Sequence, residues 1–102
     1  MKIVVIGPEA LRLGYESGGA EFVSTDTPQE ALQQVLKSSS NEGVGMLLIA
    51  SMFAQPIQTD IDRIRATRPL PLILEISDFE KKPREQSEWL SSIAAIFGIK
   101  VS

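Results

Sequence analysis

Residues 1–19 read MKIVVIGPEALRLGYESGG, and this stretch decides the fold. Residues 3–6 form a short, β-branched, apolar run, which is typical of a strand covered on both faces in a parallel sheet. Gly7 marks a turn, a helix-like stretch follows, and the glycines between residues 14 and 19 end that helix. Because strand, glycine turn and helix in this order also build phosphate-binding sites, the stretch raises the question of whether the chain is a nucleotide enzyme.

Three further segments predict strands. Residues 46–50 and 70–76 repeat the apolar character of the first run. Residues 21–24 are short and more polar, as expected of a strand at the edge of a sheet.

Helical patterns lie between the predicted strands. Residues 27–30 read TPQE and fit a capping box, which starts one helix. A further helix is predicted to begin at Pro56 and to end before Pro69, because apolar residues recur there at spacings of four and three. The last helix is predicted over residues 84–97. Its apolar face comprises Trp89, Ile93, Ile96 and Phe97.

Strands that alternate with helices predict an α/β fold with a parallel sheet and right-handed crossovers. We expect four strands in the order 2-1-3-4, helices on both faces, a flavodoxin/receiver-like topology and a C-terminal amphipathic helix. Residues 1–77 would form the α/β core, and residues 78–102 a charged connector and the last helix of the same domain. The first three helices are expected to enclose the sheet.

Composition excludes several classes of function. The chain has 102 residues, a net charge of -3 and neither His nor Cys. Nucleic acid is not an expected partner, because phosphates attract basic surfaces. No apolar run reaches the ~20 residues that span a bilayer, and no cleavable signal pattern precedes the first strand, so we expect a cytoplasmic location. Without His or Cys, the commonest catalytic bases, nucleophiles and metal ligands are missing.

Spacing argues against a phosphate site. A Walker A loop needs Gly-x-x-x-x-Gly-Lys-Ser/Thr, but Gly7 and Gly14 lie too far apart and a Tyr-Glu pair follows. Gly-x-Gly-x-x-Gly is absent from the stretch as well, and Pro8 lacks an N–H for an anion. A phosphoacceptor receiver site needs acids where residues 8–9 read Pro-Glu and residues 50–51 read Ala-Ser. We therefore expect no catalysis, cofactor, metal or small-molecule substrate.

Two features are not typical of a plain core. Glu75 sits in the most apolar predicted strand, near the carboxyl end where open α/β sheets carry functional residues. A buried charge is costly, so we expect Glu75 at the rim of the sheet, facing a partner or a basic side chain. The last helix also carries large aromatic residues that could face a partner. The candidate partner-binding residues are Glu75, Ile76, Trp89, Ile93, Ile96 and Phe97.

In the order and spacing of its motifs, the whole chain resembles the F subunits of the A/V-type rotary ATPases. The matching residues are Lys2, Ile3, Val5, Ile6 and Gly7; Gly14, Tyr15 and Gly18; Thr27 to Leu32; Pro71, Ile73, Glu75 and Ile76; and Phe97, Gly98 and Ile99. The chain departs from the family pattern at Pro8, at Ser51-Met52 and at Ser77. These departures affect loops at the carboxyl edge of the sheet.

The resemblance implies a non-catalytic component of the central rotor stalk. Members of the family bind the long coiled coil of the stalk, which is the D subunit, turn with it inside the catalytic head and modulate ATP hydrolysis or synthesis coupled to proton or sodium transport. The last helix would pack on its own domain or reach the A/B head, and the location would be cytoplasmic, peripheral to the membrane. From the residues alone, the alternatives are a degenerate receiver-like interaction module without a phosphoacceptor, or a small nucleotide-binding enzyme.

Overall fold

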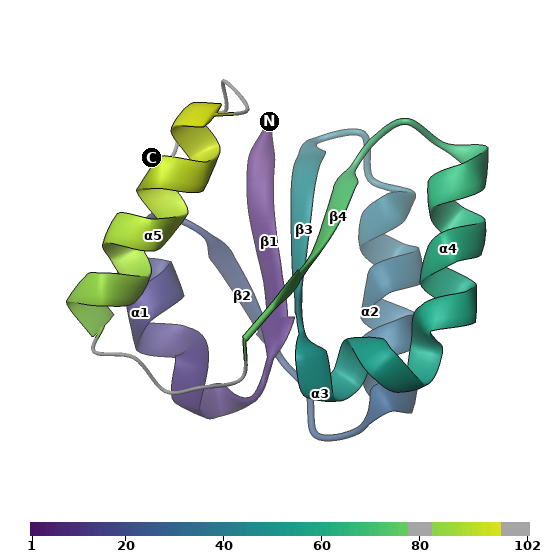
Figure 1. Cartoon of the computed structure of the whole chain (residues 1–102), viewed down its shortest axis with the longest axis horizontal. Coiled ribbons are helices and arrows are strands. Elements are labelled where there is room, and N and C mark those ends of the chain that lie inside the picture. Colours follow the sequence, from purple (N-terminus) through teal and green to yellow (C-terminus); the bar gives the residue numbers. More distant parts are fainter. Residues whose placement is uncertain (78–82, 97–102) are drawn as a thin grey trace.

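One parallel sheet with the strand order β2-β1-β3-β4 forms the centre of the molecule (Figure 1). The strands are β1 (Lys2–Gly7), β2 (Glu21–Ser24), β3 (Val44–Ala50) and β4 (Leu72–Ile76). The computed structural model describes residues 1–77 and 83–96, with the side chains of the last helix described from Ser87 onward. Strand order and parallel pairing confirm the predicted sheet.

Three strands begin at residues other than those predicted. β1 begins at Lys2 instead of residue 3. β3 begins at Val44, earlier than the predicted residue 46. The prediction missed this start because Gly45 has no side chain to extend the apolar pattern, although its backbone continues the strand. β4 begins at Leu72 instead of residue 70. Pro71, which precedes it, has no N–H to donate to a sheet.

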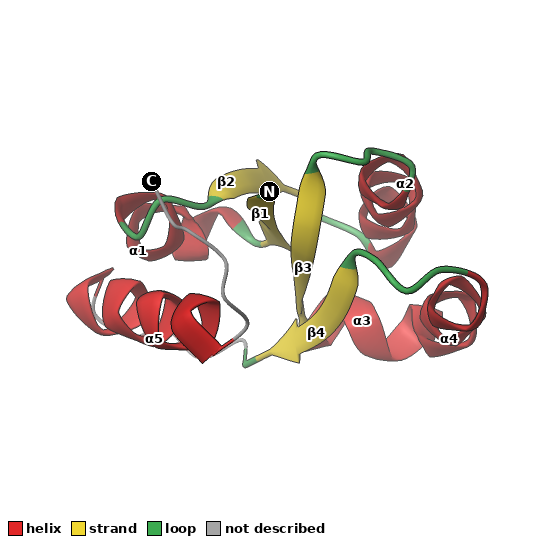
Figure 2. Ribbon diagram, turned by 90° about the horizontal axis from the view of Figure 1, so that it is seen from above, coloured by secondary structure: helices red, strands yellow, loops and turns green. Residues whose placement is uncertain are grey.

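Helices cover both faces of the sheet, as predicted (Figure 2). One face carries the 3-10 turn η1 (Glu9–Leu11), α1 (Arg12–Ser17) and α5 (Pro83–Ile96). The other face carries α2 (Pro28–Ser39), α3 (Ser51–Ala54), the 3-10 turn η2 (Gln55–Ile57) and α4 (Gln58–Thr67). This two-sided cover matches the sequence of β3, whose seven residues are all buried.

The helix predicted to begin at Pro56 begins earlier and is interrupted. α3 starts at Ser51, immediately after β3, and Pro56 lies within η2. Because Pro56 has no backbone N–H, it cannot donate to a carbonyl in the preceding turn. The backbone departs from helical geometry at Ile57, with φ -112° and ψ 23°, before α4 continues.

The last helix contributes to the core. Leu90 is fully buried and Ala94 is 1% exposed, and α5 lies beside α1 in both views (Figures 1 and 2). The expectation that the first three helices enclose the sheet is therefore wrong. α1 has six residues and spans roughly 9 Å, so it is too short to cover its face of the sheet alone. The packing of α5 supports placing residues 1–102 in one domain, which stays a prediction for residues 78–82 and 97–102 because they lie outside the described part.

The capping box at the start of α2 forms with one changed partner. The Thr27 hydroxyl accepts the Glu30 N–H at 3.2 Å, as predicted. The Glu30 carboxylate accepts the N–H of Asp26 at 3.2 Å instead of that of Thr27. Two backbone donors are satisfied at this helix end, which fixes where the chain leaves β2 and enters α2.

Replacement of Thr27 by Ala is expected to lower the free energy of unfolding by about 1 kcal/mol, since it removes this cap. For a domain of this size that corresponds to a fall in Tm of roughly 4–8 °C, measured by circular dichroism. Thr59→Ala is the matched control, because Thr59 is exposed in α4 and is expected to change stability by less than about 0.5 kcal/mol. Equal effects of the two substitutions would contradict the cap.

Candidate partner-binding surface

Gly7, at the end of β1, is explained by packing. A Cβ placed there would lie 3.3 Å from the Cβ of Ala50, 3.5 Å from Leu11 Cδ1 and 3.8 Å from Phe22 Cζ. The element that follows is a 3-10 turn of three residues, with Pro8 at its N-cap. The strand, glycine and helix of the opening stretch therefore meet in a close-packed corner of the core.

Ser51 occupies the place, after β3, where a receiver domain carries its phosphoacceptor. Its hydroxyl donates a hydrogen bond of 2.8 Å to the carbonyl of Ile76. This bond joins the end of β3 to the end of β4, so the side chain has a structural partner. At the start of α1, Arg12 donates to Glu9 at 2.6 Å and lowers the pKa of that exposed carboxyl.

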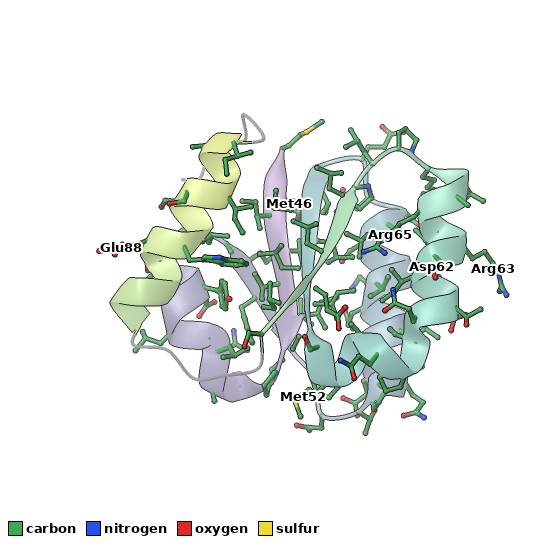
Figure 3. All side chains as sticks on the ribbon, viewed as in Figure 1. Met46, Met52, Asp62, Arg63, Arg65 and Glu88 are labelled. Atoms are coloured by element: carbon green, nitrogen blue, oxygen red, sulfur yellow. The ribbon has the colours of Figure 1, made fainter. Side chains whose placement is uncertain are left out.

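Glu75 lies next to the last residue of β4, which is an edge strand, and its side chain is exposed. It shares a small hollow with Ile61, Arg65 and Ile73, on the face of the sheet that α4 covers. Arg65 donates to the carbonyl of Ile73 at 2.6 Å and lies 3.5 Å from Asp62 (Figure 3). In the part of the chain that the structure describes, no cation pairs with the Glu75 carboxylate.

Ile76 does not share a surface with Glu75. It is 2% exposed and belongs to the core, and successive side chains of a strand point to opposite faces of the sheet. The side chain of Ile76 is therefore not available at the surface for the predicted contact with a partner.

The apolar residues predicted on α5 are only partly brought together. Trp89 and Ile93 are half-buried and pack against the core, whereas Ile96 is 77% exposed. Phe97 lies outside the described residues. The Trp89 ring meets Tyr15 of α1 edge to face, with the ring centres 6.2 Å apart. Burial raises the pKa of the Tyr15 hydroxyl.

Leu90 and Ala94 form the buried face of α5, which the predicted apolar stripe did not include. Ser87 donates a hydrogen bond of 2.9 Å to the carbonyl of Gly14. A Cβ on Gly18 would lie 2.9 Å from Leu90 Cδ2 and 3.2 Å from the Cα of Ser87. The sequence did contain a signal for this contact between α1 and α5. Gly14 and Gly18 are four residues apart, and so are Leu90 and Ala94 on the facing helix.

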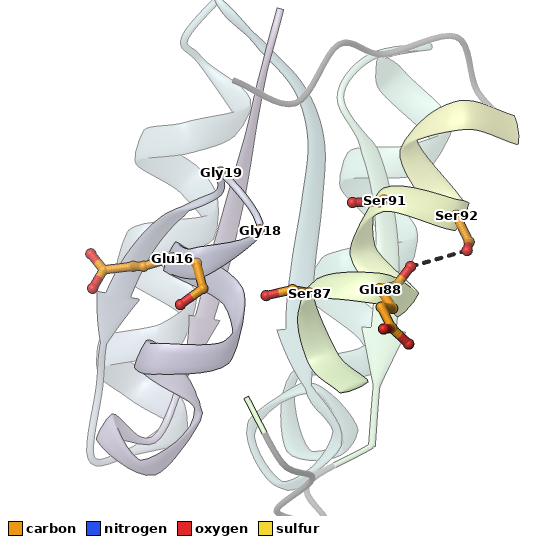
Figure 4. A pocket seen from close by; sticks show the side chains of 8 residues that line it. Glu16, Gly18, Gly19, Ser87, Glu88, Ser91 and Ser92 are labelled. Carbon is orange, nitrogen blue, oxygen red and sulfur yellow. Dashed lines mark hydrogen bonds between the residues drawn. The ribbon is translucent and has the colours of Figure 1, made fainter. Parts of the chain in front are cut away.

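An open groove of about 570 Å³ runs beside this contact (Figure 4). Its lining residues are Glu16, Ser17, Gly18, Gly19, Ser87, Glu88, Ser91 and Ser92. Ser17 and Ser92 donate to carbonyls of their own helices, Leu13 and Glu88. With the bond from Ser87 to the carbonyl of Gly14, three hydroxyls of the groove therefore donate to backbone carbonyls. Among the described residues, no serine of the groove pairs with a catalytic base.

Gly18→Val is expected to push α5 away from α1, because the added side chain would overlap Leu90 and Ser87. Overpacking of this kind costs about 1–3 kcal/mol. The single Trp of the chain, Trp89, reports the movement as a red shift of its fluorescence. Ser17→Val is the control, since Ser17 is exposed on the preceding position. Native emission and native melting of Gly18→Val would show that α5 does not need this glycine.

Membrane-spanning helices and metal clusters are both absent from the described residues. None of the helices there combines the length and the apolar character required to cross a bilayer. No group of three or more His, Cys, Asp or Glu residues among them could hold a metal ion.

Comparison with known families gives a match over most of the fold. The family model described as ATP synthase (F/14-kDa) subunit matches residues 3–93, which include the whole sheet apart from Lys2 and most of α5. No curated protein sequence matches the chain. The family match confirms the resemblance drawn from the motifs, and the chain belongs to the ATP synthase (F/14-kDa) subunit family.

Proposed function

We propose that the chain is a non-catalytic component of the central stalk of a V-type or A-type rotary ATPase. It would bind the coiled-coil protein of the stalk, the D subunit, and modulate ATP hydrolysis or synthesis coupled to proton or sodium transport. The observation that carries this proposal is the family match over residues 3–93, which covers the α/β fold from its first strand into its last helix.

The chemistry of the carboxyl edge of the sheet supports a role without catalysis. At the two positions where related folds place phosphate chemistry, Gly7 is closely packed and Ser51 bonds to the Ile76 carbonyl. The chain has no His and no Cys, so the commonest bases and nucleophiles are missing. Its contribution to the ATPase would be mechanical, exerted through contacts with the shaft in the cytoplasm, at the periphery of the membrane.

α5 supports a second contact, toward the catalytic A/B head. The helix is held by the buried Leu90 and Ala94, by the half-buried Trp89 and Ile93, and by the hydroxyl of Ser87. Its far end carries Ile96, whose apolar side chain is largely exposed to solvent. A helix that packs on its own domain and carries a further apolar residue at its exposed end can have two resting places, one on the domain and one on the head.

Co-expression of the full chain with the coiled-coil stalk protein of the same complex tests the proposal. We expect the two proteins to co-elute in gel filtration, and we expect the ATPase rate of the assembled head to change when the chain is added. A chain that elutes alone and leaves the ATPase rate unchanged would contradict the proposal and favour a receiver-like interaction module without a rotor partner.

Glu75→Ala is expected to weaken assembly more than it lowers the Tm, because the carboxylate is exposed and makes no ion pair within the described residues. The change in stability should stay within about 0.5 kcal/mol. Glu42→Ala, an exposed acid in the turn before β3, is the matched control for assembly. A badly destabilised monomer that assembles normally would make Glu75 a structural residue.

A further inference from the structure

A second groove lies between the C-terminal halves of α2 and α4. Both helices lie on the face of the sheet opposite α5 (Figures 1 and 2). Its volume is about 260 Å³. It is lined by Leu36, Ser39, Ser40, Arg63, Ile64, Thr67 and Arg68. We call it the α2–α4 groove.

The floor of the α2–α4 groove is apolar and accessible. Leu36 is 50% exposed, although it stands on the same helix as the buried Ala31 and Val35. Ile64 is half-buried and packs against the core from the opposite helix. Leu36 and Ile64 face the same groove from two helices. An apolar side chain of a partner could therefore bury its surface between them.

The rim of the α2–α4 groove is cationic. Arg68 donates a hydrogen bond of 2.6 Å to the carbonyl of Ser39, at the C-terminal end of α2. That bond uses one of five guanidinium donors and holds the group in place, so further donors can meet a carboxylate at a reduced entropic cost. Arg63 has a side chain that is 73% exposed, and the acid it pairs with, Asp60, lies 4.0 Å away. In Figure 3, Arg63 projects from α4 into solvent.

Among the described residues, no acid lines the α2–α4 groove. The hydroxyls of Ser39, Ser40 and Thr67 all donate to backbone carbonyls of the helices that they belong to or end. The groove therefore presents an apolar floor and two guanidinium groups, in a chain whose net charge is -3. This local reversal of sign favours an acidic ligand with an apolar side chain close to its carboxylate.

We propose that the α2–α4 groove docks an acidic amphipathic helix of a partner protein. An aliphatic side chain of that helix packs on Leu36 and Ile64. A Glu or Asp one helical turn away, at i+3 or i+4, lies on the same face of the helix and pairs with Arg68 and Arg63. Arginine suits this position because its planar fork binds carboxylates through paired hydrogen bonds. The inference rests on the proposed function, which supplies the helix: it belongs to the coiled-coil stalk protein.

The test compares three variants of the full chain for binding to the purified coiled-coil stalk protein. Arg63→Glu reverses the rim charge, and Leu36→Ser removes the apolar floor. Lys37→Glu is the matched control, because Lys37 follows Leu36 but lines a different hollow, beside Lys2 and Glu21. Arg68 is left unchanged since it also holds the end of α2. Circular dichroism melts establish that every variant folds.

We expect Arg63→Glu and Leu36→Ser each to raise the Kd by about tenfold or more, and Lys37→Glu to change it by less than about threefold. Binding of the native chain should also weaken with added salt more steeply than binding of Arg63→Glu. Native-like affinity of both groove variants, beside a native chain that binds, would overturn the docking site alone. A native chain that fails to bind the coiled coil would overturn the proposed function and the docking site together. A dimer of the native chain that Arg63→Glu abolishes would assign the groove to a second copy and overturn the inference.

Discussion

The burial of β3 on both faces is the constraint on which the rest of the structure depends. All seven of its residues are buried, and a strand of this kind needs a layer of helices on each side of the sheet. On one side α2, α3 and α4 supply that layer. On the other side α1 is too short, and α5 completes the cover with Leu90 and Ala94. The last helix is thus part of the fold, and any second position it takes would expose apolar surface beside α1.

The sequence predicted what depends on local pattern and missed what depends on packing. The strand order, the parallel pairing and the Thr27 cap follow from apolar runs and capping chemistry, and the structure confirms them. The apolar spacing within α5 did not decide its rotation, because Trp89 and Ile93 form as good an apolar stripe as Leu90 and Ala94. The deciding signal lay outside the helix, in the glycines of α1 and its C-terminal end. The choice is made by Gly18, which lets the Leu90 face approach α1 closely. The break before α4 was missed for a related reason, since a proline can start a helix or interrupt one.

On each of the two edge strands of the sheet, an arginine side chain lies at a backbone carbonyl. On β4, Arg65 donates to the carbonyl of Ile73 at 2.6 Å. On β2, Arg12 lies 3.5 Å from the carbonyl of Phe22 and stacks over its ring at 5.1 Å. Free carbonyls on edge strands are sites for pairing with another chain, and charged side chains at these edges oppose it. The exposed carboxylate of Glu75 extends this protection along β4, so its charge has a use in the free protein as well as a predicted one in the complex.

The two candidate surfaces differ in how they are attached to the sheet. The α2–α4 groove joins two helices that pack on the sheet, and Arg68 ties them together through the carbonyl of Ser39. α5 is attached by the packing of Trp89, Leu90, Ile93 and Ala94 and by the hydrogen bond from the Ser87 hydroxyl to α1. Since these surfaces lie on opposite faces of the sheet (Figure 2), occupation of one does not block the other. Under the proposed function, rotation with the shaft would need a contact that stays fixed, and regulation would need one that can change. In the proposed function, the α2–α4 groove would supply the fixed contact and α5, whose end carries the exposed Ile96, the one that changes.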